Sequence, residues 1–447
     1  MKFHSVSGYN EVGKNMSVID LGNEAIAFDM GVYLPPIVEL EEKEKKFVSE
    51  QGLRKIGALP EDDKLSLDVK KKIKTICLSH AHLDHVGAIP YIGNHYNAEV
   101  AGTPYTIEVL NSLLKDRENR QNRPKLNPIR RVTPNSSFMT QGKKYEVEFL
   151  NITHSTPQAS LIVVHTPKGA IVYANDFKFD NNPIIGKRPD YDRLREIGKQ
   201  GVLALIVESL YADHEGKTPS EKIARGLLED VLLTTENKGQ GIVVTTFSSH
   251  IARLKSIVDC AKQLNRKILF VGRSLHKYVS AANNAKLVPF MQDINLVTFR
   301  DQLERKLKKA NQNKKDWLLV CTGHQGEPGS ILERMSRGGL PYRLGHSDHV
   351  VFSSKIIPTP INFENRGVVD KRLKEKGVRI FTDVHVSGHC SREDLRDLIT
   401  MLNPQHIIPA HAEIGRRKAL AELATEVGYA VNKDIHLMSN GDSINLN

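Results

Sequence analysis

Short apolar segments separated by turn residues dominate the first part of the chain. Residues 15–21 and 24–30 alternate polar and apolar positions, which predicts antiparallel strands of a sheet covered on one face. Residues 35–72 are charged, bounded by prolines and weakly periodic, so we expect a surface insertion with some helix there. Further strands are predicted at 75–79, 147–152, 160–166 and 170–176. Residues 1 to about 205 therefore predict a β-rich domain covered by helices.

From residue 203 onward, strands alternate with helical patterns. Continuous apolar runs are typical of parallel strands buried on both faces, and they occur at 203–209, 241–247, 267–272, 317–321 and 349–354. Thr218–Glu221 begins a helix, with a proline near its first turn. Ser248 or Ser249 is expected to cap the helix over 251–264. Residues 209 to about 360 thus predict a doubly wound α/β domain.

The last part of the chain returns to the style of the first. A helix is expected from Ser391, where Asp394 completes a capping box. A strand at 406–410 and a terminal strand pair at 435–439 and 442–446 follow. The simplest arrangement is one discontinuous domain (1–207 and 363–447) that receives an inserted domain (208–362).

Composition and charge narrow the function classes. A chain of 447 residues with 40% hydrophobic residues predicts two or three globular domains. No apolar run is long enough for a membrane span, and no apolar core follows the N-terminus, so we expect a cytoplasmic protein with no membrane contact. The cysteines are scattered and predicted to be reduced core residues: Cys77, Cys260, Cys321 and Cys390.

The net charge of +11 favours a polyanionic partner, of which nucleic acid is the commonest, although solubility alone is an alternative reason for it. Three basic runs, at 69–74, 305–309 and 371–376, fall on predicted helix surfaces or turns. Each run is therefore interpreted as a solvated face rather than as a dedicated binding stripe.

The strongest chemical signal is the segment SHAHLDHVGAIP at 79–90. Alternate histidines at the end of a strand, His80 and His82, can point at one ion, and Asp84 and His85 on the following turn can reach a second. Imidazole and carboxylate are ligands that zinc and manganese favour. A histidine-rich surface loop is the alternative, but four potential ligand residues at this spacing after a buried strand argue against it.

Further ligands are expected at the ends of other strands. His154, Asp176 and His411 each follow an apolar strand, so they can meet at one sheet edge. Taken alone, each of them is more often structural. Asp29 ends another strand, where it can orient a ligand by hydrogen bonding.

These residues resemble the signature of the metallo-β-lactamase superfamily: an aspartate, HxHxDH, a histidine, an aspartate and a final histidine. The resemblance implies that His80, His82 and His154 hold one Zn²⁺, that Asp84, His85 and His411 hold a second, and that Asp176 bridges them. It also implies a hydroxide between the ions as nucleophile, with Mn²⁺ or Mg²⁺ able to substitute. The implied fold is an αββα sandwich.

The inserted α/β segment resembles the β-CASP insertion of nucleic-acid-processing members, which carry an acidic residue after a strand and two histidines. Glu208, His389 and His411 match that pattern. The resemblance implies that Glu208 orients His389, which protonates the leaving ribose oxygen. A histidine at position 411 favours RNA over DNA.

Three turns at strand ends can present N–H and O–H groups to phosphate. The candidate residues in these turns are Ser248, Ser249, His250, Gly323, His324, Gln325, Gly326, His385, Ser387, Gly388 and His389. Together they indicate a track for an RNA backbone.

The three turns resemble those of the RNase J family, and the short C-terminal part and the charged 35–72 segment resemble its archaeal branch. The resemblance implies a 5′→3′ exoribonuclease on single-stranded RNA with a 5′-monophosphate end, with a homodimer and RNA-decay proteins as partners. Alternatives are an endoribonuclease, a thioester or lactam hydrolase, and a non-enzymatic RNA-binding scaffold.

Overall fold

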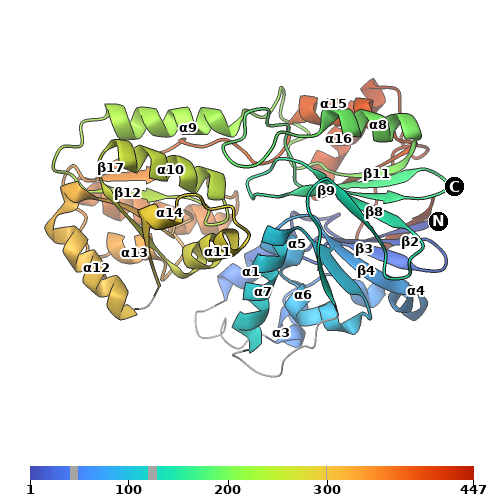
Figure 1. Ribbon diagram of the computed structural model, residues 1–447, viewed down its shortest axis with the longest axis horizontal. Coiled ribbons are helices and arrows are strands. Elements are labelled where there is room, and N and C mark those ends of the chain that lie inside the picture. The colour runs from blue at the N-terminus through green and yellow to red at the C-terminus, as the bar shows by residue number, and fades with distance from the viewer. Residues whose placement is uncertain (41–48, 119–127, 299, 447) are drawn as a thin grey trace. The chain divides into compact units, whose positions relative to one another are not determined.

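The computed structural model describes residues 1–40, 49–118, 128–298 and 300–446. The chain forms two compact units (Figure 1). The split unit comprises Met1–Asn181, Lys187–Thr218 and Gly388–Asn447. The inserted unit comprises Asn182–Gly186 and Pro219–Ser387.

Two sheets form the centre of the split unit. The first has seven strands in the order β19 (Asp442–Asn445), β1 (Lys2–Ser7), β2 (Met16–Asp20), β3 (Ala25–Phe28), β4 (Ile73–Leu78), β5 (Glu99–Gly102) and β6 (Ile129–Arg131). The second has the order β18 (His406–Ala410), β11 (Val202–Glu208), β10 (Ala170–Ala174), β9 (Ser160–His165), β8 (Glu146–Asn151) and β7 (Ser136–Met139). The alternation of apolar residues places one face of each sheet against the other, and their shared core includes Phe28, Cys77, Phe149, Ile171, Tyr173 and Ile206.

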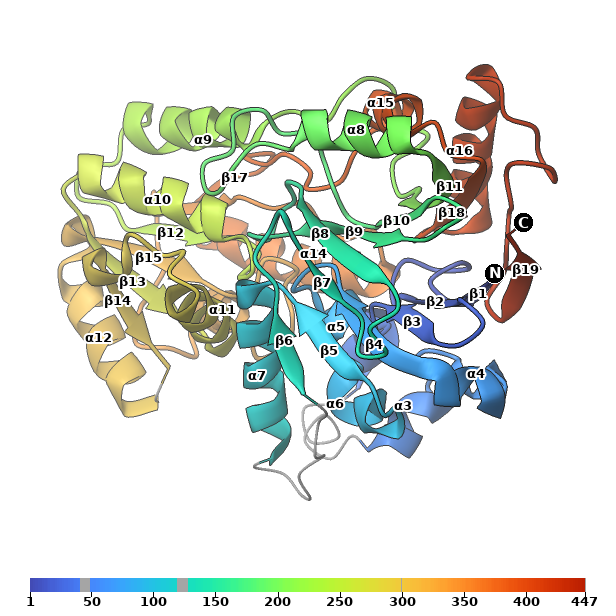
Figure 2. The same ribbon diagram turned by 45° about the vertical axis from the view of Figure 1, so that its right-hand side comes forward.

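Helices cover the two outer faces of these sheets, which gives the αββα sandwich (Figure 2). The first sheet is covered by α1 (Leu34–Glu39), α3 (Glu50–Lys55), α4 (Leu67–Lys72), α5 (Leu83–Val86), α6 (Ile89–Ile92) and α7 (Pro104–Glu118). The second sheet is covered by α8 (Tyr191–Gln200), α15 (Arg392–Leu402) and α16 (Ile414–Glu426). Short 3₁₀ turns lie at Asp62–Lys64 and Gly93–His95.

The inserted unit is a parallel α/β fold. Its sheet has the order β14 (Ile294–Val297), β13 (Lys267–Val271), β15 (Trp317–Cys321), β12 (Ile242–Thr245), β16 (His349–Phe352) and β17 (Arg379–Phe381), with every pair parallel. One face packs on α12 (Arg300–Gln312), α13 (Ile331–Ser336) and α14 (Pro360–Glu375). The other helices are α9 (Glu221–Glu229), α10 (Ile251–Gln263) and α11 (Arg273–Asn284), with a π-helical turn at Asp230–Thr234 and 3₁₀ turns at Met291–Asp293 and Lys314–Asp316.

The connections of the inserted unit change direction within its sheet. The connection from β12 runs toward β13, whereas the connections from β15 and β16 run toward the opposite edge of the sheet. Ligands of open α/β sheets bind at the carboxyl ends of the strands where the direction of the connections reverses. The turns after β12 and β15 therefore lie where the sequence predicted contacts to phosphate.

The predicted fold class is confirmed, and so are the capping box at Ser391 and the buried, unpaired state of the four cysteines. The predicted cap of α10 is wrong, because His250 occupies that position and accepts the N–H of Arg253. The predicted terminal strand pair is also wrong. Only β19 forms there and pairs with β1, while Ile435 makes isolated bridges.

The charged segment at 35–72 contains the helices α1, α3 and α4, as expected, although 41–48 lie outside the described residues. Several short strands are not predicted by the sequence: β5, β6, β7, β14 and β17. Each of them has only three or four residues, which is too short for a clear alternation.

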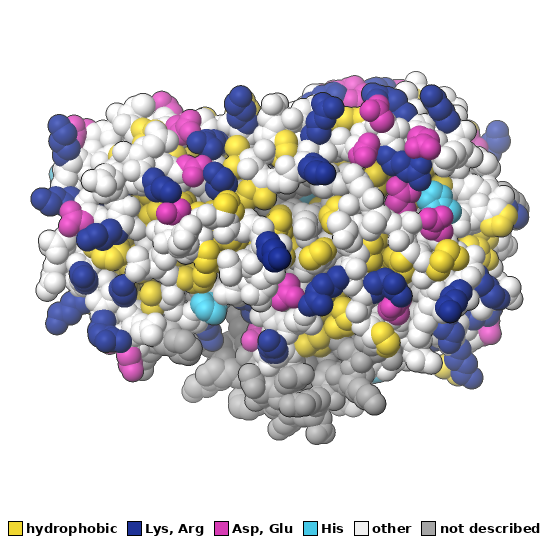
Figure 3. Space-filling model, viewed as in Figure 1, with side chains coloured by type: hydrophobic (Ala, Val, Ile, Leu, Met, Phe, Trp, Pro, Cys, Tyr) yellow, Lys and Arg dark blue, Asp and Glu magenta, His cyan; other side chains and the backbone are white. Residues whose placement is uncertain are grey.

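Charges of both signs are mixed on one face of the molecule. On the face in Figure 3, Lys and Arg side chains are spread over many elements and interspersed with Asp and Glu. Among the residues that the structure describes, no helix is both long and apolar enough to cross a membrane.

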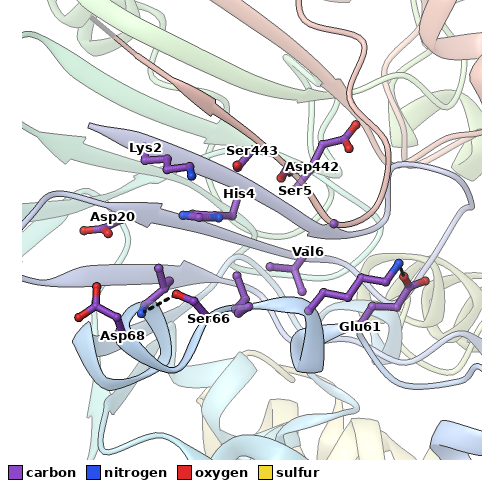
Figure 4. A pocket seen from close by; sticks show the side chains of 14 residues that line it. Lys2, His4, Ser5, Val6, Asp20, Glu61, Ser66, Asp68, Asp442 and Ser443 are labelled. Carbon is purple, nitrogen blue, oxygen red and sulfur yellow. Dashed lines mark hydrogen bonds and ion pairs between the residues drawn. The ribbon is translucent and has the colours of Figure 1, made fainter.

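A surface pocket of about 390 Å³ lies between β1, the β19 end and α4 (Figure 4). Two of its charged groups form ion pairs: Glu61 with Lys64 at 2.5 Å, and Asp68 with Lys72, outside the lining, at 2.7 Å. None of the residues that line this pocket is a predicted site residue.

Candidate metal centre

The predicted metal ligands follow strands whose carboxyl ends share one edge of the sandwich. In the first sheet, β3 and β4 run parallel. In the second, β10 pairs parallel with β11, which pairs parallel with β18. Parallel strands deliver the residues after their ends to the same edge, which explains why positions far apart in the sequence meet.

The structure brings the seven predicted ligands into two adjoining clusters. His80, His82, His154 and Asp176 form the first, and Asp84, His85, Asp176 and His411 form the second. In each cluster the ligand atoms lie within 4.8 Å of one another. Asp176 belongs to both, with Oδ2 3.4 Å from His80 Nε2 and Oδ1 3.3 Å from His411 Nε2. A carboxylate placed in this way can bridge two cations.

The far nitrogen of four histidines is held by a hydrogen bond, which leaves Nε2 for the cluster. Nδ1 of His154 donates to the carbonyl oxygen of Gly388 at 2.7 Å, and Nδ1 of His85 contacts Asp29 at 2.7 Å. The corresponding contacts are His80 to Ser79 Oγ at 3.0 Å and His411 to Asn15 Oδ1 at 2.8 Å. Such outer partners fix the ring orientation and tautomer that a metal requires.

Asp29 holds residues of the centre in place by hydrogen bonds. It is fully buried, and its carboxylate accepts the N–H and the hydroxyl of Ser79, both at 2.8 Å, as well as contacting His85. The backbone of Asp29, Asp176 and His411 has φ values of 57°, 58° and 54°. The left-handed region is costly for such residues, by about 1–3 kcal/mol each, and it clusters at functional sites.

The protonation of the first cluster's histidines and the distances between their nitrogens suit a bound cation. Burial lowers the pKa of His80, His82 and His154, and that of His82 reaches about 3. These rings are therefore neutral and can offer a nitrogen lone pair to a metal ion. His82 Nδ1 lies 3.1 Å from His80 Nε2 and 3.2 Å from His154 Nε2. Lone pairs that converge at this distance repel unless a cation lies between them.

The acidic side of the centre attracts positive charge. Burial opposes a charged His85, but the carboxylates Asp176, Asp84 and Asp29 outweigh it and raise the pKa of His85 well above its ordinary value. Asp176 Oδ1 is buried without a hydrogen-bond partner. The donor set therefore fits divalent metal ions.

Glu208 and His389 form a pair beside the metal clusters. Nδ1 of His389 lies 2.8 Å from Oε2 of Glu208, and the N–H of Phe177 donates to Oε1 of Glu208 at 2.7 Å. Glu208 is fully buried and the side chain of His389 is 20% exposed. Burial opposes protonation of His389, but the charges of Glu208 and Asp176 and the hydrogen bond to Glu208 raise its pKa to about 9. These contacts therefore favour the protonated ring.

The predicted phosphate residues divide between the two units. Gly388 and His389 belong to the split unit, and the others belong to the inserted unit. There, His324 and His385 both lie against Phe247, at ring-centre distances of 4.3 and 6.2 Å. The hydroxyl of Ser248 meets that of Ser274 at 3.0 Å. The ends of β12, β13 and β15 thus converge.

Other members of that set are held by contacts within the inserted unit. The amide of Gln325 binds the backbone of Lys355 and Ile357. His250 caps α10, and Ser249 is nearly buried. Gly326 has φ 76° and approaches the backbone of Asn365 so closely that a Cβ would lie 2.5 Å from it.

Three residues that contribute to these sites were missed from the sequence: Ser79, Asn15 and Ser274. Ser79 stands inside the histidine motif and was visible there. Asn15 contacts His411, which is 396 positions away in the chain, and no sequence pattern indicates this contact.

Gly31 lies against the backbone of the metal motif, and its replacement by alanine should displace the ligands. The Cβ would lie 1.6 Å from the carbonyl oxygen of Asp84. We expect G31A to weaken metal affinity about 10- to 100-fold, the range for disturbed ligand support. The metal affinity is measured by recording the thermal unfolding temperature at increasing metal concentrations. In the control G415A, on α16, the added methyl meets nothing within 4 Å. Unchanged metal affinity in G31A would contradict the expectation.

An αββα sandwich with this ligand cluster and a parallel α/β insertion defines a metallo-β-lactamase protein with a β-CASP domain. Family models match accordingly: the metallo-beta-lactamase superfamily over 57–232, the ribonuclease J beta-CASP domain over 239–370, and a Zn-dependent metallo-hydrolase RNA specificity domain over 377–438. The chain belongs to the ribonuclease J family, because it is 42% identical over 447 residues to ribonuclease J of Pyrococcus abyssi, covering 100% of this chain and 97% of that protein.

Further relatives agree. Ribonuclease J of Methanocaldococcus jannaschii is 42% identical over 98% of this chain and 97% of its own length. Ribonuclease J of Mycoplasma genitalium is 29% identical, and the match spans 72% of that longer protein. A crystal structure of a protein of unknown function from Enterococcus faecalis aligns with a TM-score of 0.69 at 17% identity, covering 99% of each chain, which supports the fold alone.

Proposed function

We propose that this protein is a two-zinc 5′→3′ exoribonuclease that acts on single-stranded RNA and prefers a 5′-monophosphate end. The observation that carries the proposal is the pair of adjoining clusters that share Asp176, beside the Glu208–His389 pair. Membership of the ribonuclease J family supports RNA as the substrate. RNA decay and processing in the cytoplasm is the corresponding role, and reduced cysteines fit that compartment.

The proposed ligand set is His80, His82 and His154 for one ion and Asp84, His85 and His411 for the other, with Asp176 between them. When bound, two metal ions supply an activated nucleophile at neutral pH and stabilise the charge that develops on a phosphodiester. Zn²⁺ suits a site of mainly imidazole ligands, and Mn²⁺ or Mg²⁺ is expected to substitute.

His389 is proposed to be the general acid. Its imidazolium can give a proton to the departing ribose oxygen, and Glu208 orients the ring and keeps the proton on it. Glu208 in turn is fixed by the N–H of Phe177, which directly follows Asp176. The acid is therefore positioned by the same segment that holds the metal ligand.

The 5′-phosphate is proposed to bind at the carboxyl ends of β12 and β15, where Ser248, Ser249, His324 and Gly326 lie, with His385, which follows β17, as a further donor. The reversal of the connections within this sheet supports this location. The end-group preference would follow if these donors bind a terminal phosphate more strongly than a hydroxyl.

The first experiment uses RNA with a labelled 5′-monophosphate, digested by wild type and by D84A. We expect wild type to release the label at once as a mononucleotide and D84A to release none. Labelled fragments of intermediate length would instead support the second candidate, an endoribonuclease of the same fold. Circular RNA provides the control, because an exonuclease leaves it intact.

Simple measurements distinguish this proposal from functions outside the ribonucleases. A lactam or thioester hydrolase would cleave a chromogenic lactam, and an RNA-binding scaffold would bind RNA without cutting it. A homodimer and association with RNA-decay proteins are also proposed, and sedimentation of the full chain tests the first.

A further inference from the structure

Arg253, on α10 of the inserted unit, is a fully buried arginine. Its guanidinium makes a two-pronged contact with Glu221, the first residue of α9. Nε lies 2.5 Å from Oε1, and Nη2 lies 2.9 Å from Oε2. Burial of an ion pair costs desolvation free energy, so the pair by itself is weak evidence for a stabilising role. The contacts of the remaining nitrogen, Nη1, therefore say more about the function of this side chain.

The free side of the guanidinium binds two other segments. Nη1 donates to the carbonyl oxygen of Ser353 at 2.9 Å and to its hydroxyl at 2.8 Å. The same nitrogen reaches the carbonyl oxygen of Val384 at 3.3 Å and Nδ1 of His385 at 3.4 Å. One side chain thus ties the end of β16 to the segment that carries His385.

The contact with His385 decides which ring nitrogen carries the proton. A guanidinium has N–H donors and no acceptor, so the nitrogen that faces it must be unprotonated. The ring is then neutral, and its single N–H is at Nε2, on the side away from Arg253. Four charged or titratable groups act on this ring: Arg253, His250, Glu221 and Lys355. Burial, then the charges of Arg253 and His250, lower the pKa of His385 to about 3.

We propose that Arg253 is a positioning residue that holds His385 as a neutral imidazole with its proton at Nε2, ready to donate to an anionic phosphate oxygen. This inference rests on the proposed binding of a 5′-phosphate by His385. Glu221 has the supporting role of fixing the guanidinium plane. The site then recognises phosphate by a hydrogen bond and not by an imidazolium charge.

A neutral donor has a measurable consequence. Between about pH 7 and 8.5, where a terminal phosphate is mostly dianionic, its capture by His385 does not change with pH. An imidazolium paired with the phosphate dianion would have its pKa raised toward this range, and binding would weaken as the pH rises through that pKa.

The direct test is ¹⁵N NMR of the histidine rings in the full-length wild type, with the His385 signal assigned by its loss in H385Q. Ring nitrogens with and without a proton have well-separated shifts. We expect a protonated Nε2 and a bare Nδ1 throughout the pH range. An imidazolium, or a proton on Nδ1, overturns the proposal.

The functional test compares kcat/KM for RNA with a 5′-monophosphate and with a 5′-hydroxyl. We expect E221Q/R253Q, which removes both buried charges together, to lower this ratio about tenfold, the effect of one charged hydrogen bond, and to mix the two tautomers. E229Q/R225Q, which removes an Arg–Glu pair on α9, should leave the kcat/KM ratio and the tautomer of His385 unchanged. If the double variant is unfolded, R253K, which keeps the charge with fewer donors, replaces it.

The two tests distinguish failure of the proposed 5′-phosphate site from failure of the proposed role of Arg253. If wild type shows no preference for the 5′-monophosphate, the proposed 5′-phosphate site fails, while the NMR result still decides the tautomer. An unchanged ratio and an unchanged tautomer in folded E221Q/R253Q would overturn the role of Arg253.

Discussion

Replacement of Asp176 by asparagine is expected to abolish RNA hydrolysis, with kcat falling on the order of 10³-fold or more. Asp176 is the one residue shared by both metal clusters, and asparagine keeps its shape while removing the charge that a bridging ligand requires. The apoprotein should remain folded, because the change removes negative charge from a site that already holds Asp84. The measurements are single-turnover hydrolysis, bound metal per chain, and thermal unfolding with and without added Zn²⁺.

The stability measurement gives an independent result. A metal that binds only the folded state raises the unfolding temperature with concentration. This increase should be large in wild type and reduced in D176N. The control is D192N, since Asp192 is 97% exposed on α8. A D176N protein that holds two ions and cleaves RNA at the wild-type rate would disprove the assignment of Asp176.

Replacement of His389 by glutamine is expected to lower kcat about 10²- to 10⁴-fold, the range for loss of a general acid. The metal content should stay unchanged, since the proposed ligands are intact. A substrate with a p-nitrophenolate leaving group needs no proton, so H389Q should cleave it at nearly the wild-type rate. An equal loss on both substrates would indicate a general disturbance of the site and would exclude the proposed role.

The same role predicts a direction in the pH profile. His389 is competent when protonated, so the rate falls as the pH rises through its pKa. Burial lowers that pKa, and the charge of Glu208 raises it. In E208Q the raising charge is lost, so the alkaline fall in rate should move to lower pH. Bound cations would offset the negative charge of Asp176, so Glu208 remains the main cause of the raised pKa of His389. A fall in rate that stays at the wild-type pH would contradict this role of Glu208.

Much of the metal centre was predictable because its ligands obey local rules. His80, His82, Asp84 and His85 are contiguous, and His154, Asp176 and His411 each follow an apolar strand. Strand ends are recognisable from hydrophobicity, and parallel strands share an edge. The parallel sheet of the inserted unit was predictable for the same reason, since its buried strands are continuous apolar runs.

Short or weakly patterned elements were not predictable. β14 and β17 have four and three residues, and their place in the sheet depends on neighbours that are distant in the chain. The cap of α10 was assigned to serine on propensity, but a buried network with Glu221 and Arg253 placed His250 there. Tertiary contacts outweigh a capping preference of about 1 kcal/mol.

The sequence by itself determined the class of fold, the residues of the candidate metal centre and the basic character of the chain, because each depends on residue type and near spacing. Only the tertiary structure decided how those residues are held. The contacts of Asn15 with His411, of Gly388 with His154 and of Arg253 with His385 join positions 396, 234 and 132 residues apart. Such contacts set ring orientation and proton position, and they exist only once packing has excluded water and fixed each partner in place.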